Sequence, residues 1–433
     1  MKNTAMTNWD AESWKASFQT ASKLRDRDSL RALRKRVFTD TCQWVREGEY
    51  VAPSGNIIRL DTVTSSYLVK TPIAPQPAQE YESVEIEVWN EDTLLAAKRL
   101  KEEGYHPAAL NMANRQTPGG GVYEGSGAQE ENLFRRTNLL KELYKYASFA
   151  EQYGVQKASE GYPMDRNYGG VMARGITVFR GTEEDGYPLL EEPYVVDIVS
   201  VAAIRNPDTE NGRLTPKMIE GTKNKIRTIF RLAISNGNDA LVLGAFGCGA
   251  FRNPPEHMAE IFGEVLDESE FRHAFRKVVF AIIDDHNAHL KHNAHGNYWP
   301  FRNYFDSRKM LSQRLSINFE MSRDYVNIDD GARVLMLIEK TGSNPDKYVL
   351  KNCTEASYNG GMAYDQVVFG KTFDEIVAFN SFSYVAYVAL RDGAEWNLYV
   401  VTEEPYSPGG RLTPIHMAGT MTALSDVTAF FSH

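Results

Sequence analysis

Residues 110–144 read LNMANRQTPGGGVYEGSGAQEENLFRRTNLLKELY, and this stretch decides how the rest of the chain is interpreted. An apolar strand comes first, a glycine-rich loop follows, and a helix then opens on two glutamates. The consecutive glycines Gly119, Gly120 and Gly121 permit positive φ and let a ligand approach the backbone without a Cβ in the way. The stretch therefore predicts a ligand-binding loop between a strand and a helix.

The helix after the loop predicts where the two glutamates lie. Ser126 and Gln129 have the spacing of a capping box, so we expect the helix to begin near Gly127 and to continue through FRRTNLLKELY. Glu130 and Glu131 then fall in the first turn, where free backbone amides and the helix dipole favour negative charge. For an isolated pair of glutamates, helix capping alone would explain them.

The composition is that of an ordinary globular protein. The chain has 433 residues, of which 42% are hydrophobic and 24% charged. Its net charge of −9 argues against electrostatic binding to nucleic acid or to an anionic membrane. Three widely spaced cysteines imply no disulfide framework, and no apolar run approaches the length of a membrane span. We therefore expect a cytoplasmic protein.

Strands and helices alternate over residues 50–300, which predicts a three-layer α/β domain. A second glycine-rich loop, residues 244–253, follows the apolar strand LVL and precedes a helix. Ligands bind such folds beyond the carboxyl ends of the strands, where both glycine-rich loops fall. Gly247 and Gly249 could present amides to a diphosphate, although close packing alone also explains glycines at such a turn.

The chain is long enough for two domains. We expect residues 1–306 to form the α/β domain, with 1–50 as a helical extension, and residues 307–433 to form a smaller α+β domain of unknown role. In that second domain we expect several strands, a short helix near 373–379 and a turn at 407–414.

Taken together, the two glycine-rich motifs resemble the microbial-type poly(ADP-ribose) glycohydrolases, whose catalytic domain is a macrodomain. The resemblance rests on LNMAN, on GGG followed after seven residues by QEE and LFRRT, and on GAFGCGAFRNP downstream, and it covers about residues 20–285. It implies a macrodomain-like mixed sheet, an ADP-ribose pocket, and catalysis without a metal or another cofactor.

The resemblance also implies roles for individual residues. Glu131 would be the catalytic acid and base, and Glu130 would hydrogen-bond the ribose or the preceding unit of the polymer. Phe251 is a candidate ring against ADP-ribose, and Asp197 would either hold a strand end or contact adenine. The substrate-binding residues implied by the family pattern are Asn111, Asn114, Gly119, Gly120, Gly121, Gln129, Gly247, Cys248, Gly249, Ala250 and Phe251.

The implied reaction is hydrolysis of the ribose–ribose O-glycosidic bonds of poly(ADP-ribose), with release of ADP-ribose. It passes through an oxocarbenium-like centre, and the leaving alkoxide needs a proton that a shielded glutamate can hold. The implied partners are ADP-ribose and its polymer on modified proteins, with nucleic acid only as an ADP-ribosylated substrate, and no membrane. Two alternatives stay open: a hydrolase for mono-ADP-ribose on protein or nucleic acid, and a module that binds ADP-ribose without turnover.

Three further features have plain structural explanations. Four histidines recur every three residues, but on a helix this spacing drifts by about 60° per step and cannot converge on one metal ion. We expect Cys248 to be inert, and Arg135 and Arg136 to form a solvated helix face. The histidines, which we expect on the surface, are His286, His289, His292 and His295.

Overall fold

The computed structural model describes residues 9–76, 79–82, 84–285 and 287–306 in full and, beyond them, the backbone of eight strands. The chain divides into two compact units, Met1–Phe301 and Arg302–His433, which are described separately. Our boundary at residue 306 remains a prediction. Among the helices in the described residues, none combines the length and hydrophobicity needed to cross a bilayer.

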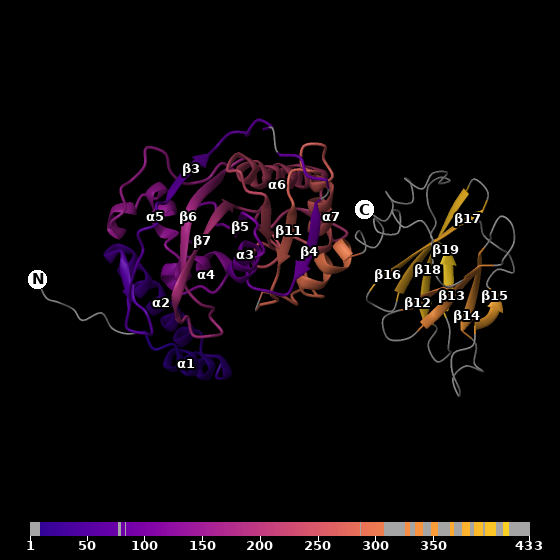
Figure 1. The fold of residues 1–433 in the computed structure, drawn as a ribbon, viewed down its shortest axis with the longest axis horizontal. Helices are drawn as coiled ribbons and strands as arrows, with labels where there is room; N and C mark the ends of the chain where they lie inside the picture. The colour runs from indigo at the N-terminus through magenta and orange to yellow at the C-terminus, as the bar shows by residue number, and fades with distance from the viewer. Residues whose placement is uncertain are drawn as a thin grey trace, which may run out of the picture. The chain divides into compact units, whose positions relative to one another are not determined.

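A seven-stranded mixed sheet forms the centre of the first unit (Figure 1), as the family resemblance implied. Its strands lie in the order β3-β6-β7-β5-β10-β11-β4, and β6 alone runs against the other six. The strands are β3 (Ser65–Val69), β4 (Glu85–Trp89), β5 (Pro107–Met112), β6 (Gly170–Arg180), β7 (Leu189–Val201), β10 (Ala240–Leu243) and β11 (Lys277–Ala281). Two small pairs stand apart: β1 (Glu49–Val51) with β2 (Ile57–Arg59), and β8 (Thr209–Glu210) with β9 (Arg213–Leu214).

Helices cover both faces of this sheet and give three layers. Tyr194 and Val201 lie an odd number of positions apart in β7, so they point to opposite faces. The Tyr194 hydroxyl donates to Leu94 O of α3, whereas Val201 lies with Leu232 of α6 around Gly170. The longer helices are α3 (Thr93–Glu102), α4 (Gln129–Arg136), α6 (Pro216–Ser235) and α7 (Pro255–Leu266), and the shorter ones are α5 (Leu140–Leu143), η1 (Val122–Glu124), η2 (Tyr144–Tyr146) and η3 (Ala150–Tyr153).

The helical extension at the N-terminus consists of α1 (Ala11–Lys23) and α2 (Arg27–Glu47). Asp10 and Asp26 cap the two helices, and α2 ends at Gly48 in the left-handed conformation. The buried guanidinium of Arg180 at the end of β6 lies 4.4 Å from the ring centres of both Trp9 and Trp44. These cation–π contacts attach the extension to the sheet.

The second unit contains two four-stranded antiparallel sheets, β12-β13-β14-β15 and β16-β17-β18-β19. The prediction of a short helix near 373–379 is wrong, because strand β16 (Glu375–Ser381) occupies that region. The turn expected at 407–414 is also wrong in its second half, where β19 (Gly410–Pro414) pairs with β18 (Glu395–Glu403). The remaining strands are β12 (Tyr325–Asp329), β13 (Val334–Lys340), β14 (Tyr348–Cys353), β15 (Tyr364–Val367) and β17 (Val385–Asp392).

Candidate functional site

The first glycine-rich loop connects β5 to α4 and folds back against the start of that helix. Gly119 and Gly120 have φ of +80° and +53°, the positive values that the sequence predicted, whereas Gly121 has φ of −95°. A Cβ on Gly120 would lie 2.5 Å from Oε1 of Glu131 and 3.0 Å from Oε2 of Glu130. Glycine at position 120 therefore allows both carboxyl groups to pack against the loop.

Glu130 and Glu131 are buried, with 4% and 7% of their surfaces exposed. Backbone amides hold both oxygens of Glu130: Asn114 N donates to Oε2 at 2.7 Å, and Gly119 N donates to Oε1 at 3.0 Å. Oε1 of Glu131 accepts from Gly121 N at 2.8 Å, while its buried Oε2 has no hydrogen-bond partner among the described residues. Among the described residues, that buried oxygen therefore keeps an unused hydrogen-bond acceptor position.

The two carboxyl groups differ in their electrostatics as well. Burial, and after it the neighbouring charge of Glu131, raises the pKa of Glu130 to about 8, against opposing hydrogen bonds from Asn114, Gly119 and Asn111. The raised pKa favours the neutral form of the Glu130 carboxyl group, at a site closed to bulk water.

Helix α4 begins two residues later than the sequence predicted, and the capping box is wrong. Ala128 is the N-cap residue, and no side chain caps the helix. The side chain of Gln129 turns to the sheet instead, donating to Leu110 O at 2.7 Å and accepting from Met112 N at 3.0 Å. The helix also ends at Arg136, so it does not run on through the rest of the motif.

The two asparagines of LNMAN have different surroundings. Asn111 is fully buried and donates from Nδ2 to Ser200 Oγ at 3.0 Å, while its Oδ1 has no partner among the described residues. Asn114 folds over its own loop, where its Oδ1 accepts from Gln116 N and Thr117 N. Ligand contacts by either asparagine remain predictions.

The second glycine-rich loop connects β10 to α7. Gly247 has φ of +76°, and a Cβ there would lie 2.5 Å from Nδ2 of Asn253 and 2.6 Å from Cβ of Ala203. The Asn253 amide donates to Ile204 O at 2.8 Å and to Gly247 O at 3.1 Å. Asn253 is therefore a positioning residue for this loop, which the sequence analysis did not single out although it belongs to the same motif.

Within this loop, Cys248 is buried and its neighbours are more accessible. Burial raises the pKa of the Cys248 thiol well above its ordinary value, which agrees with an inert side chain. Ala250 is exposed and Phe251 is half-buried. The ring of Phe251 is thus within reach of a ligand.

A cavity of about 500 Å³ joins the two motifs. Its wall includes Gln129 from α4 and Gly247, Gly249, Ala250 and Phe251 from the second loop. Successive helical residues point about 100° apart, so one face of α4 lines the cavity while its two glutamates face the first loop. In the described structure, the other predicted residues are not in this wall: Asn111, Asn114, Gly119, Gly120, Gly121, Cys248, Glu130 and Glu131.

The expectation of a solvated face at Arg135 is wrong. Arg135 is fully buried, and its Nη1 donates to Ser126 O at 2.7 Å within the first loop. Its Nε donates to the Tyr187 hydroxyl at 2.8 Å, which in turn donates to Glu183 at 2.7 Å. Glu183 forms a bidentate ion pair with Arg34 of α2. The sequence analysis missed this network because the partners of Arg135 come from segments that are distant in the chain.

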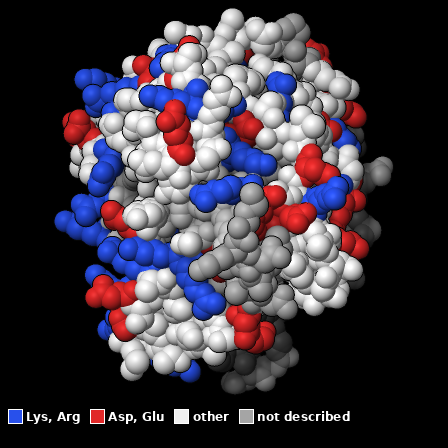
Figure 2. All heavy atoms as spheres, turned by 90° about the vertical axis from the view of Figure 1, so that its left-hand side faces the viewer, with Lys and Arg blue, Asp and Glu red and all other residues white. Residues whose placement is uncertain are grey.

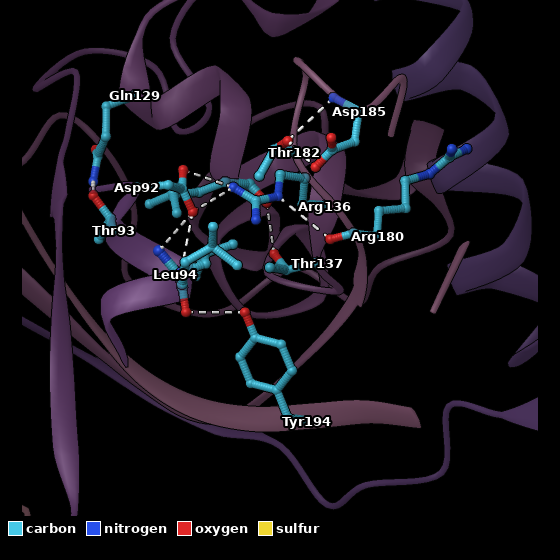
Figure 3. Close-up of polar contacts among 12 residues, drawn as sticks. Asp92, Thr93, Leu94, Gln129, Arg136, Thr137, Arg180, Thr182, Asp185 and Tyr194 are labelled. Carbon is cyan, nitrogen blue, oxygen red and sulfur yellow. Dashed lines mark hydrogen bonds and ion pairs between the residues drawn. The ribbon is translucent and has the colours of Figure 1, made fainter. Parts of the chain in front are cut away.

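Arg136 is buried too, and the solvated-face expectation fails for it as well. Its Nη1 contacts both carboxylate oxygens of Asp92 at 2.8 Å, and its Nε donates to Arg180 O (Figure 3). Asp92 also caps α3 and belongs to the cavity wall. The contact therefore joins the end of α4 to the rim of the cavity.

Two other predicted features lie outside the cavity. Asp197 pairs with Ala108, next to the first residue of β5, and it accepts from Gly175 N and from Asn236 and Asn238. It holds a strand end at the sheet edge opposite the glycine-rich loops, so the adenine-contact alternative is wrong. Among the described residues, no three His, Cys, Asp or Glu side chains gather as a metal would require, and His286 lies outside those residues.

Comparisons with known proteins find one family to which this chain is similar. A family model described as "Microbial-type PARG, catalytic domain" matches residues 39–181. The poly(ADP-ribose) glycohydrolase of Thermomonospora curvata is 29% identical over 60% of this chain and 96% of its own, with a TM-score of 0.49. Its complex with the inhibitor ADP-HPD is 28% identical over 62% of this chain and 97% of that one, with a TM-score of 0.48.

A second bacterial enzyme is more similar in sequence. Poly(ADP-ribose) glycohydrolase from Deinococcus radiodurans, in complex with ADP-ribose, is 31% identical over 51% of this chain and 83% of its own, with a TM-score of 0.40. No curated protein matches the chain.

Proposed function

The chain belongs to the microbial-type poly(ADP-ribose) glycohydrolase family, and from this premise we infer that it hydrolyses the ribose–ribose O-glycosidic bonds of poly(ADP-ribose) and releases ADP-ribose. Membership follows from the family model and from 31% identity over 83% of the Deinococcus radiodurans enzyme. The enzyme is a glycoside hydrolase.

We assign the general acid and base role to Glu131. One observation supports this choice most: Oε2 of Glu131 is buried and unpartnered among the described residues, whereas amides occupy both oxygens of Glu130. In the proposed reaction, Glu131 protonates the leaving ribose oxygen as the C1″–O bond breaks. It then accepts a proton from the water that adds to the anomeric carbon, which restores the acid.

Glu130 supports this chemistry without taking part in it directly. The raised pKa of Glu130 favours its neutral form, which lowers the negative charge of the pair near the substrate's diphosphate. A neutral carboxyl can also donate to a ribose hydroxyl, as the family resemblance implies. We expect the substrate's diphosphate to help position water in place of a second catalytic carboxylate.

The terminal ADP-ribose unit is proposed to extend along the second loop. Gly247 and Gly249 lie in the cavity wall just before α7, where backbone amides suit a diphosphate. Phe251 lies in the same wall and can pack against the ligand. The Thermomonospora curvata relative was crystallised with ADP-HPD and the Deinococcus radiodurans relative with ADP-ribose, which supports this class of ligand.

The Glu131→Gln variant tests the assignment. We expect kcat on poly(ADP-ribose) to fall by about 10²- to 10⁴-fold, the usual range for a lost acid–base catalyst. The dissociation constant for ADP-ribose, from titration calorimetry, should stay within about threefold, since the amide keeps the volume of the carboxyl. Glu160→Gln, at an exposed glutamate, is the control. Full turnover by the Glu131 variant would refute this role.

Two alternatives remain for comparison. Thin-layer analysis of labelled polymer and of singly modified protein separates a polymer hydrolase from a mono-ADP-ribosyl hydrolase. Tight ADP-ribose binding without release from either substrate would indicate a binding module. A cytoplasmic location and a role on modified proteins remain predictions.

A further inference from the structure

The helical extension carries positive charge on a chain whose net charge is −9. From the start of α1 to the end of α2, residues 11–47, there are nine Lys or Arg residues against five Asp or Glu residues. Figure 2 looks onto the side of the unit that bears α1 and α2, and it shows a band of Lys and Arg side chains across its left and centre. This local charge opposes that of the whole chain and would attract an anion.

Three of these cations form a stripe along α2. Arg27, Arg31 and Lys35 are spaced four residues apart, so they lie on one side of the helix at intervals of about 6 Å. All three are exposed, and none forms an ion pair with another described residue. Arg34 differs, because its guanidinium is engaged by Glu183. The stripe therefore has free charge to offer a ligand.

The stripe borders the loop that leads into α4, the helix that carries the proposed catalytic acid. A Cβ on Gly125 would overlap the backbone carbonyl of Arg31, and one on Gly127 would lie 2.5 Å from the Arg34 guanidinium. The turn η1 of the same loop packs against α2. Glycines thus allow α2 to approach the loop between its GGG and QEE motifs.

An exposed aromatic ring stands in that same turn. Tyr123 is the middle residue of η1 and is 72% exposed, whereas aromatic rings of this size are usually more buried. Its position, two residues after Gly121, places it on the loop segment that borders the catalytic pair. An accessible ring beside a row of cations is how proteins hold single-stranded nucleotide chains, by base stacking and phosphate pairing.

We propose that Tyr123 and the stripe formed by Arg27, Arg31 and Lys35 are a subsite for the leaving nucleotide, the ADP-ribose unit beyond the scissile bond. The inference rests on the proposed function and deepens it. Tyr123 would stack on the adenine of that unit, and the cations would bind its diphosphate. Glu124, next to Tyr123, adds a single negative charge, which the three positive charges of the stripe outweigh.

The chemistry of the polymer favours this arrangement. The leaving oxygen belongs to the adenosine ribose of the neighbouring unit, so the adenine of that unit emerges close to Glu131. Its diphosphate lies further along the chain and needs cations outside the cavity. One guanidinium group can bind two phosphate oxygens at once, so arginine suits this position better than other side chains.

The test compares two substrates that differ in their leaving groups: poly(ADP-ribose) and p-nitrophenyl ADP-ribose, which has no leaving nucleotide. For Tyr123→Ala, and for a triple variant with Gln at Arg27, Arg31 and Lys35, we expect the ratio of kcat/KM for polymer to that for the aryl substrate to fall about tenfold. The triple variant should also show a shallower decline of polymer kcat/KM with salt. An unchanged ratio in both variants would overturn the proposal.

Matched variants separate stacking and charge from disruption of the fold. Tyr123→Phe keeps the ring and should keep the ratio, and Lys217→Gln removes an exposed cation from α6 and should also keep it. A Glu131→Gln background provides a binding measurement that needs no turnover: an ADP-ribose dimer should bind about tenfold tighter than ADP-ribose, and the triple variant should lose this preference.

The binding measurement also distinguishes the possible failures. If the unmodified protein hydrolyses neither substrate but still prefers the dimer, the proposed function fails while the subsite stands. If single-stranded RNA of equal charge competes as well as the dimer, the surface is a general polyanion site and the subsite proposal is wrong.

Discussion

Gly120 and Glu131 are in such close contact that any side chain at position 120 would collide with the carboxyl group. The Cβ of an alanine there would lie 2.5 Å from Oε1 of Glu131. The backbone at Gly120 also has φ of +53°, which residues with a Cβ rarely adopt. The loop and the carboxyl group are therefore fitted to each other.

Gly120→Ala should cost both stability and turnover. We expect the free energy of unfolding to fall by about 1–3 kcal/mol from backbone strain and overlap, and kcat to fall at least tenfold because Glu131 must move. Urea unfolding and steady-state kinetics measure the two effects. Gly104→Ala is the control, since Gly104 has φ of +86° with nothing within 4 Å of its Cβ position. Equal kinetics for the two variants would contradict the expectation.

Tyr187→Phe should loosen the first loop from a distance. The change leaves the buried Nε of Arg135 without its acceptor, which costs about 1–3 kcal/mol of unfolding free energy. Because Arg135 also holds Ser126 O, we expect a several-fold loss of kcat. Tyr194→Phe is the control: it removes a hydroxyl that donates to Leu94 O and has no contact with Arg135, and it should spare kcat. Similar kcat losses in both would argue against a specific path through Arg135.

The pH profile of kcat/KM should decline above about pH 8. Burial and the charge of Glu131 hold the pKa of Glu130 at about 8, and ionisation above it adds a negative charge beside the substrate's diphosphate. In Glu131→Gln the pKa of Glu130 should fall, since one of its causes is removed. Carbon-13 NMR of the Glu130 carboxyl measures this shift, and a rise in that pKa would contradict the assigned cause.

The free energy of unfolding should depend on pH through the contact of His106 with Asp197. Nε2 of His106 lies 3.0 Å from Oδ2 of Asp197. The hydrogen bond to Asp197 raises the pKa of His106, so its contribution is complete below about 6.5 and is lost as pH rises through the raised value. Asp197→Asn should reduce the difference in unfolding free energy between pH 5.5 and 8.5 relative to the unmodified protein. A difference as large as before would show that other groups cause it.

Asn253→Ala should weaken ADP-ribose binding by loosening the second loop. The variant removes the amide that donates to Ile204 O and Gly247 O, so the Gly247 backbone loses its support. We expect the dissociation constant, measured by calorimetry, to rise about tenfold. Asn236→Ala, whose amide donates to Asp197 away from the loops, should leave it unchanged.

The sequence by itself determined the local chemistry of this protein. Periodicity and glycine residues predicted the alternating strands and helices of the first unit, and the GGG and QEE motifs predicted a glycine-rich loop followed by two first-turn glutamates. These features depend on residues close together in the chain, because the backbone freedom of a glycine and the start of a helix are set over a few residues. The same local reasoning failed at Ser126, because Gln129 found backbone partners in β5 and did not complete a capping box.

Only the tertiary structure decided which polar residues are buried and what they contact. Arg135 and Arg136 look like a solvated face because their partners, Tyr187 and Asp92, are about fifty residues away in the chain and are recruited by the fold. The difference between Glu130 and Glu131 likewise arises from which loop amides reach each oxygen. Burial and long-range hydrogen bonding depend on every element packed around a side chain, so no stretch of sequence specifies them alone.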